Sequence, residues 1–239
     1  MGKKLLEGKI AVVTGASRGI GAAICKRYAK EGAHVVMVAR SVNEMESVDD
    51  EIQEIGGSAT IVPLDLQDFD KIDQLGAGLM ERFGKIDILV GNAGVLGGLS
   101  PIDHIDPKIW QNIFDVNVTA NYRLLRSLTP LLKQSDAGRA LFVSSDVARG
   151  VVLHWGAYAA SKAALEKMVE IYAAENEHTN IRAAIVDPGA VATAMMNIWA
   201  PGADQEKLTK PDEITDIFVE LLLEDSDIEE GGVFYAQNG

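Results

Sequence analysis

The stretch KIAVVTGASRGIG, residues 9–21, decides the fold of this chain. An apolar run ends at Thr14, glycines follow at positions 15, 19 and 21, and a helical pattern runs from Ala22 to Glu31. Strand, glycine-rich turn and helix in this order are typical of a nucleotide-binding unit, because glycines let the backbone approach a pyrophosphate and the free amides of the helix start attract its charge. The spacing departs from G-x-G-x-x-G, so the segment alone does not distinguish a nucleotide site from an ordinary turn.

The same alternation of apolar runs and helical patterns continues along the chain. Strands are predicted at 33–39, 59–64, 86–90, 140–145, 181–186 and 232–236, and helices at 43–55, 68–83, 107–132, 158–175 and 211–223. Near-continuous apolar strands between helices indicate a parallel sheet covered on both faces. We therefore predict one α/β domain over residues 1–239, with a Rossmann-like, doubly wound, mostly parallel seven-stranded sheet and helices on both faces.

Composition excludes several classes of protein. The 239 residues are 47% hydrophobic, which suits a globular domain with a sizeable core. A net charge of -13 disfavours nucleic acid and anionic membranes as partners, because their phosphates would be repelled. Cys25 is the only cysteine, so no internal disulfide is expected. No apolar run has the length of a membrane span or signal peptide, and we predict a cytoplasmic protein without a metal.

Four residues that are suited to binding a dinucleotide follow predicted strands: Gly15, Arg40, Asp65 and Asn92. In open parallel sheets ligands bind beyond the carboxyl ends of the strands. Arg40 stands where an acidic residue would bind a ribose 2′-hydroxyl, and Arg18 lies inside the glycine loop. Two guanidiniums are suited to one 2′-phosphate, so the sequence predicts NADP(H) rather than NAD(H).

Tyr158 and Lys162 are four residues apart in a helical pattern and are therefore expected to share one helix face. A neighbouring ammonium favours the phenolate and lowers the pKa of a tyrosine. Such a phenol can give a proton to a developing alkoxide or take one from an alcohol. Ser144 and Ser145, a short distance upstream, offer a hydroxyl to position the carbonyl oxygen.

Taken in order, these residues resemble the compact, single-domain short-chain dehydrogenase/reductases, over essentially the whole chain. The resemblance is carried by TGASRGIG at 14–21, Asp65, Asn92-Ala93-Gly94, Asn117, Ser145 thirteen positions before Tyr158, the Y-x-x-x-K pair, and Pro188-Gly189 with Thr193. It implies catalytic roles for Asn117, Ser145, Tyr158 and Lys162, with Ser144 as an alternative that the spacing disfavours. It implies cofactor contacts for Gly15, Ser17, Arg18, Gly19, Ile20, Gly21, Arg40, Asp65, Leu66, Asn92, Ala93, Gly94, Tyr158, Lys162, Pro188, Gly189 and Thr193.

The resemblance further implies an NADP(H)-dependent oxidoreductase that moves a hydride between NADPH and a ketone or aldehyde, or the corresponding alcohol. Alternatives are a reductase of β-ketoacyl thioesters on an acyl carrier protein, a non-catalytic NADP(H) sensor, and an isomerase or dehydratase. A homotetramer or homodimer is expected. The stretch from about 190 to 210 is interpreted as a substrate lid. Candidate pocket residues are mostly apolar: Val95 to Leu99, Val147, His154, Trp155, Met195, Met196 and Trp199.

Two segments depart from the family pattern. Gly91 replaces the first asparagine of the common N-N-A-G, and the C-terminal EGGVFYAQNG lacks a clean match to the usual ending.

Overall fold

A computed structural model describes residues 4–200, 202–204, 206–223 and 231–237. In this part of the chain, seven strands form one sheet in the order β3-β2-β1-β4-β5-β6-β7, and every pair of neighbours is parallel. The strands are β1 (Ile10–Thr14), β2 (His34–Ala39), β3 (Ser58–Pro63), β4 (Ile88–Gly91), β5 (Gly138–Val143), β6 (Ile181–Asp187) and β7 (Val233–Tyr235). The strand order reverses between β1 and β4, which confirms the predicted doubly wound α/β fold.

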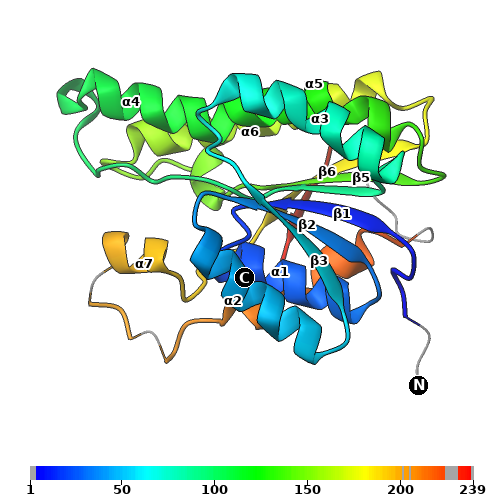
Figure 1. Ribbon diagram of the computed structural model, residues 1–239. Coiled ribbons are helices and arrows are strands. Elements are labelled where there is room, and N and C mark those ends of the chain that lie inside the picture. Colours follow the sequence, from blue (N-terminus) through cyan, green and yellow to red (C-terminus); the bar gives the residue numbers. More distant parts are fainter. Residues whose placement is uncertain (1–3, 201, 205, 224–230, 238–239) are drawn as a thin grey trace.

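Helices cover both faces of the sheet (Figure 1). One layer consists of α3 (Phe69–Phe83), α4 (Pro107–Phe114), α5 (Ala120–Leu132) and α6 (Gly156–Glu175), and the other of α1 (Gly19–Lys30), α2 (Val42–Glu54) and α8 (Asp216–Glu220). The short α7 (Ala194–Trp199) and the 3-10 turns η1 (Ile102–His104), η3 (Asp146–Ala148) and η4 (Pro211–Ile214) lie in connections. Among the described residues, none of the helices combines the length and apolar character that crossing a bilayer would require.

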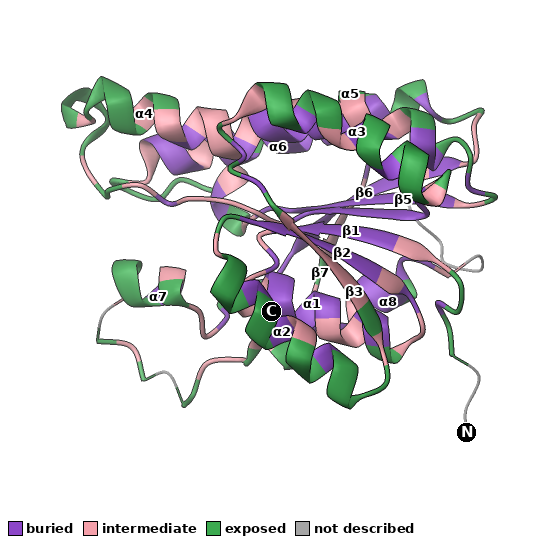
Figure 2. Cartoon of the chain, in the orientation of Figure 1, coloured by how far each residue is buried: buried purple, intermediate pink, exposed green. Residues whose placement is uncertain are grey.

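A hydrophobic core lies on each side of the sheet. Val12 belongs to the core beneath α3, α5 and α6, whereas Val13 belongs to the core beneath α1 and α2. Successive side chains of a strand point to opposite faces, so a strand covered on both sides must be apolar at every position. The central strands are accordingly buried along almost their whole length (Figure 2). This double burial accounts for the continuous apolar runs in the sequence.

The predicted helix at 107–132 is interrupted. Between α4 and α5 the chain makes a π-helical turn, η2 (Asp115–Thr119), in which the Ala120 amide donates to the Asp115 carbonyl, five residues back. The predicted helix at 211–223 is also divided, because the Thr215 hydroxyl and amide both reach the Asp212 carbonyl and close a 3-10 turn before α8. Patterns of apolar residues do not reveal either change of hydrogen bonding.

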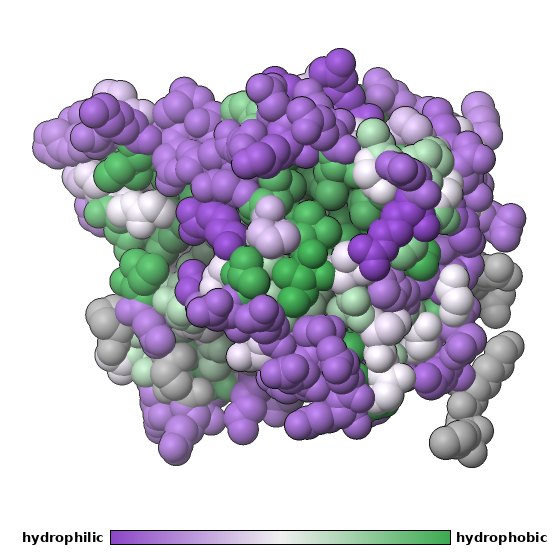
Figure 3. Space-filling view, viewed as in Figure 1, coloured by the Kyte–Doolittle hydropathy of each residue, from purple (hydrophilic) through white to green (hydrophobic). Residues whose placement is uncertain are grey.

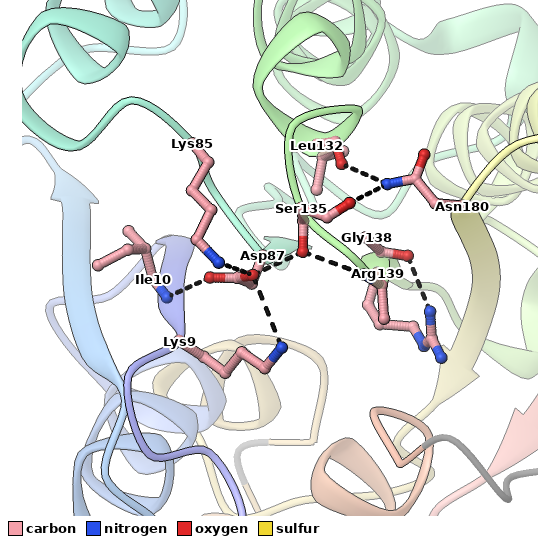
Figure 4. A network of polar contacts seen from close by, with 10 residues as sticks. Lys9, Ile10, Lys85, Asp87, Leu132, Ser135, Gly138, Arg139 and Asn180 are labelled. Carbon is pink, nitrogen blue, oxygen red and sulfur yellow. Dashed lines mark hydrogen bonds and ion pairs between the residues drawn. The ribbon is translucent and has the colours of Figure 1, made fainter.

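A buried aspartate fixes the amino ends of the central strands (Figure 4). The Asp87 carboxylate is 1% exposed and accepts hydrogen bonds from the Ile10 amide at 2.9 Å, the Lys85 Nζ at 2.9 Å and the Ser135 Oγ at 2.5 Å. Lys9 Nζ lies 3.8 Å away. Burial opposes ionisation of Asp87, but the hydrogen bonds from Ser135, Lys85 and Ile10 outweigh it and hold its pKa below the usual value.

The Asp87→Asn variant should lower the free energy of unfolding by about 3 kcal/mol, because the neighbouring lysine ammoniums and amide lose a buried anionic acceptor. A lowered native pKa stabilises the fold above the unfolded pKa of about 3.9 and loses this effect as the pH falls through the native pKa. Urea unfolding across pH 3–7 should therefore show the full difference in free energy of unfolding between the wild type and Asp87→Asn near neutrality. This difference should become smaller as the pH falls.

The control is Asp73→Asn, which breaks the half-buried pair of Asp73 with Arg123 (2.6 Å). Such a pair contributes about 0.2–1 kcal/mol. Equal losses in the two variants, or a pH-independent loss at Asp87, would show that the Asp87 cluster does not hold the strand ends.

Candidate active site

The glycine loop between β1 and α1 has no room for side chains at two of its predicted positions. A Cβ on Gly21 would lie 2.2 Å from the Gly15 carbonyl oxygen, and a Cβ on Gly15 would lie 2.8 Å from the Asn92 amide nitrogen. Gly15 and Gly19 have φ of +66° and +56°, which disfavour other residues. The glycines therefore let the loop pack closely on itself and on the Asn92-Ala93 segment at the start of α1.

The ends of β1 and β4 are joined by side chains that cross between them. Thr14 Oγ1 accepts from the amides of Asn92 and Ala93, each at 3.1 Å, and donates to the Val90 carbonyl. The Asn92 side chain donates to the Thr14 carbonyl at 2.8 Å. The Asn92 side chain thus binds the backbone of the glycine loop and fixes the shape of the loop. Thr14, 0% exposed, belongs to the motif at 14–21, but the sequence did not predict its role in the site.

The two predicted phosphate-binding arginines are both open to solvent. Arg18 lies 3.6 Å from Glu44, and Arg40 lies 3.9 Å from Asp65. Their side chains are 68% and 69% exposed, so these ion pairs are weak and do not prevent the guanidiniums from binding an anion. The loop amides, the start of α1 and these two cations form a donor set that fits the phosphates of a dinucleotide.

Other predicted cofactor positions divide into exposed and buried groups. Asp65 is exposed just beyond β3, and Ser17 is half-buried in the glycine loop. Leu66 and Ile20, in contrast, pack into or against the two cores. Any contact of these last two with a cofactor therefore involves their backbone or one edge of the side chain.

Asn117 in the π-helical turn reaches across to the segment after β4. Its Oδ1 accepts from the Val95 amide at 2.8 Å, and its Nδ2 donates to the Val95 carbonyl and the Ser161 Oγ, each at 3.0 Å. A Cβ on Gly94 would lie 3.4 Å from Asn117 Oδ1 and 3.5 Å from Lys162 Nζ. The structure therefore brings Asn117, the Asn92-Ala93-Gly94 segment and Lys162 together, although they lie far apart in the sequence.

Tyr158 and Lys162 share one face of α6, as predicted. Lys162 Nζ lies 5.6 Å from the centre of the Tyr158 ring and donates to the Val143 carbonyl at 2.8 Å. Burial lowers the pKa of Lys162 to about 8, against the opposing effect of the Glu166 and Asp187 carboxylates. Burial also raises the pKa of Tyr158, and Asp187 and Asp146 raise it further. Burial and the two carboxylates therefore set the direction of the Tyr158 pKa shift, and the expected lowering of this pKa is wrong for the protein alone.

The two adjacent serines point to different surroundings. β5 ends at Val143, two residues before the predicted strand end at Ser145. The Ser144 hydroxyl is buried and donates to Glu166 at 2.5 Å. Ser145 is half-buried, and its hydroxyl donates to the exposed Asp146 carboxylate at 3.0 Å. Of the two, Ser145 is the one accessible to a substrate.

The segment after β6 lies against the glycine loop. A Cβ on Gly19 would come 3.5 Å from the Thr193 methyl group, and the Thr193 hydroxyl accepts from the Met196 amide at the start of α7. Gln237, close to the C-terminus, donates to the carbonyls of Pro188 and Ala190. Gln237 was not predicted, and it ties the 188–190 segment to the residues that follow β7.

An apolar cluster surrounds Tyr158. Leu96 and Val147 pack with Tyr158, and Trp155 and Met195 lie against this cluster. The Trp155 ring makes edge contacts with Tyr158 (5.8 Å between centroids) and with Trp199 of α7 (5.5 Å). Apolar surface is visible between α4 and α7 (Figure 3). His154, also a predicted pocket residue, is exposed and has an uncommon φ of +71°.

The described part of the chain holds no group of three or more His, Cys, Asp or Glu side chains placed to bind a metal ion. The C-terminal departure noted in the sequence lies partly outside the described residues. Its described part, residues 231–237, includes β7, which pairs in parallel with β6.

Comparison with known proteins agrees with this geometry. The family model for short chain dehydrogenases matches residues 9–203. The uncharacterized oxidoreductase YciK of Escherichia coli K12 is 36% identical over 238 residues, covering 98% of this chain and 94% of YciK. The 2,3-dihydro-2,3-dihydroxybenzoate dehydrogenase of Bacillus subtilis is 34% identical, covering 93% of this chain and 92% of that enzyme.

Among solved structures, a short chain dehydrogenase from Escherichia coli CFT073, crystallised with NADPH, superposes with a TM-score of 0.95 at 36% identity and with 100% coverage of both chains. The match in sequence spans the glycine loop, the Tyr158–Lys162 pair and the segment after β6. The chain belongs to the short-chain dehydrogenase/reductase family of oxidoreductases.

Proposed function

We propose that the protein is an NADP(H)-dependent oxidoreductase that interconverts an apolar ketone or aldehyde and the corresponding alcohol. The observation that carries this proposal is the convergence of Tyr158, Lys162 and Asn117 with Gly94 at the carboxyl edge of the sheet, next to the glycine loop. NADPH supplies a hydride when it is bound beside these residues.

The choice of NADP(H) rests on Arg18 and Arg40. Both guanidiniums are exposed at the end where a dinucleotide's adenosine ribose would lie, and their present partners, Glu44 and Asp65, are more than 3.5 Å away. A 2′-phosphate offers them closer, charge-assisted hydrogen bonds. The relative from Escherichia coli CFT073 was crystallised with NADPH, which supports the same choice.

In reduction, Tyr158 would give its proton to the carbonyl oxygen as charge develops there. The raised pKa of Tyr158 keeps the phenol protonated at neutral pH, which suits a proton donor. Ser145 would donate to the same oxygen, a contribution of about 2.7–4 kcal/mol in comparable sites. Lys162 would hold positive charge beside the phenol, and Asn117 would fix the helix turn and the 92–95 segment against which the cofactor lies.

The pocket residues favour a neutral, apolar substrate, because Leu96, Val147, Trp155 and Met195 present no charge. We propose that residues 190–210 act as its lid, with α7 closing over Trp155 through Trp199. Residues 201 and 205 of this stretch lie outside the described part.

Self-association as a homodimer or homotetramer is supported by the outer face of α5 and α6. A cavity of about 720 Å³ there is lined largely by apolar residues, and Tyr122 and Ile171 are each 51% exposed. Packing of a second copy would cover this surface.

Replacing Tyr158 by Phe should reduce kcat for NADPH-dependent reduction of an aromatic aldehyde by about 10²–10⁴-fold, because the proton donor is lost. NADPH binding, followed by its fluorescence, should remain. Tyr172→Phe is the matched control, since Tyr172 lies on the same helix and its hydroxyl bonds to Thr129. Wild-type turnover by the Tyr158 variant would refute the proposed mechanism, and steady absence of turnover by the wild type across aldehydes, ketones and β-ketoacyl thioesters would favour a sensor.

Replacing Arg40 by Asp should weaken NADPH binding by about 10–100-fold and NADH binding far less, because only NADPH carries the 2′-phosphate. Titration of both nucleotides by fluorescence measures the two dissociation constants. Arg82→Asp, a charge-matched change at the far end of α3, should alter neither. Parallel changes in both affinities would contradict the phosphate-binding role.

A further inference from the structure

A cluster of ion pairs with two buried carboxylates lies next to the proposed catalytic pair, one helical turn beyond Lys162 on α6, and was not predicted. Arg149, just after η3, forms ion pairs with Glu166 on α6 and with Asp187 at the end of β6. The two carboxylate side chains are 8% and 3% exposed, and the Arg149 side chain is 31% exposed. One guanidinium therefore bridges two acids that lie 21 residues apart in the sequence and on different elements.

Each acid of the cluster is connected to a different part of the site. Glu166 also accepts the Ser144 hydroxyl at 2.5 Å, next to Ser145. Asp187 also accepts the Gly189 amide at 3.1 Å, in the segment expected to contact the cofactor. The Arg149 guanidinium lies over the Tyr235 ring of β7 at 5.5 Å. The fork shape of arginine allows this double attachment, which a lysine could not reproduce in full.

The cluster also sets the charge around Lys162 and Tyr158. Both carboxylates act on the Lys162 ammonium, and Asp187 acts on the Tyr158 phenol. The charged groups that face this region from η3, the following loop, α6 and β6 are Asp146, Arg149, Glu166, Glu170 and Asp187. Within this set Arg149 supplies the positive charge that offsets the acids.

We propose that Arg149 is a positioning residue for the proton-transfer pair. Its guanidinium neutralises Glu166 and Asp187, the two acids next to Lys162, and holds α6 against the Pro188-Gly189 segment. This inference rests on the proposed function. Without Arg149, two buried acids would face Lys162 and Tyr158 uncompensated. Their field would favour the ammonium and disfavour the phenolate.

The test is the ionisation of Lys162 in Arg149→Met. Lys162, whose pKa burial lowers to about 8 in the wild type, should titrate about one pH unit higher in the variant, as followed by ¹⁵N NMR of its Nζ and assigned by the loss of that signal in Lys162→Met. The pH at which alcohol oxidation by NADP⁺ reaches half its maximal kcat should move in the same direction. Arg149→Lys keeps the charge and should move both readouts much less.

A second substitution separates charge from loss of structure. Arg149→Met with Asp187→Asn restores the net charge of the three-residue cluster, and the asparagine oxygen can still accept from Gly189. Both readouts should return towards the wild-type pH. The control is Arg123→Met, which removes an arginine of similar exposure that pairs with Asp73 and lies 5.2 Å over the Phe69 ring, away from the site.

A Lys162 titration that stays in place in Arg149→Met would overturn the inference, even if the variant melts at a lower temperature. A shift that Asp187→Asn fails to reverse would overturn it as well. If the wild type turns over no alcohol or carbonyl compound, the proposed function fails, and the Lys162 titration still decides whether Arg149 controls the charge beside Lys162 and Tyr158.

Discussion

The site depends on keeping one ammonium ion buried. Lys162 is 3% exposed and has a neutral carbonyl, that of Val143, as its hydrogen-bond acceptor. Removing an ammonium from water is costly, and nearby carboxylates offset that cost only if they are themselves satisfied. Glu166 and Asp187 supply the negative charge. Arg149 forms ion pairs with both, so that these two carboxylates are not themselves buried without a partner. Much of the polar structure at the carboxyl edge follows from this balance of charges.

The fold could be predicted because its cause is local and repeated. Each buried strand is apolar at every position, and each is followed by a turn and an amphipathic helix, so the alternation is readable from the sequence without knowledge of contacts. Because crossovers between parallel strands are right-handed, only a few strand orders and helix placements are then possible. The limits of the elements were harder to predict, as the early end of β5 and the division of the helix at 211–223 show.

The site could be predicted only where its residues are close together or belong to a familiar motif. Tyr158 and Lys162 are neighbours on one helix turn, and the glycine loop is continuous. The roles of Thr14 and Arg149 were not predicted, because they come from contacts with segments far away in the sequence: Asn92 is 78 residues from Thr14, and Asp187 is 38 residues from Arg149. No spacing rule connects such residues, since the parallel sheet alone brings them together. The ionisation of Tyr158 was mispredicted for a related reason, because its burial depends on all the layers around it.

The π-helical turn at 115–119 holds one residue more than an α-helical turn would need between α4 and α5. That additional residue lets Asn117 leave the helix surface and bond to Val95 on the neighbouring connection. Deleting one residue here would give a continuous, better hydrogen-bonded helix and would rotate everything before it by roughly 100° about the axis. Such a deletion would therefore exchange the two hydrogen bonds between Asn117 and Val95 for a more regular helix.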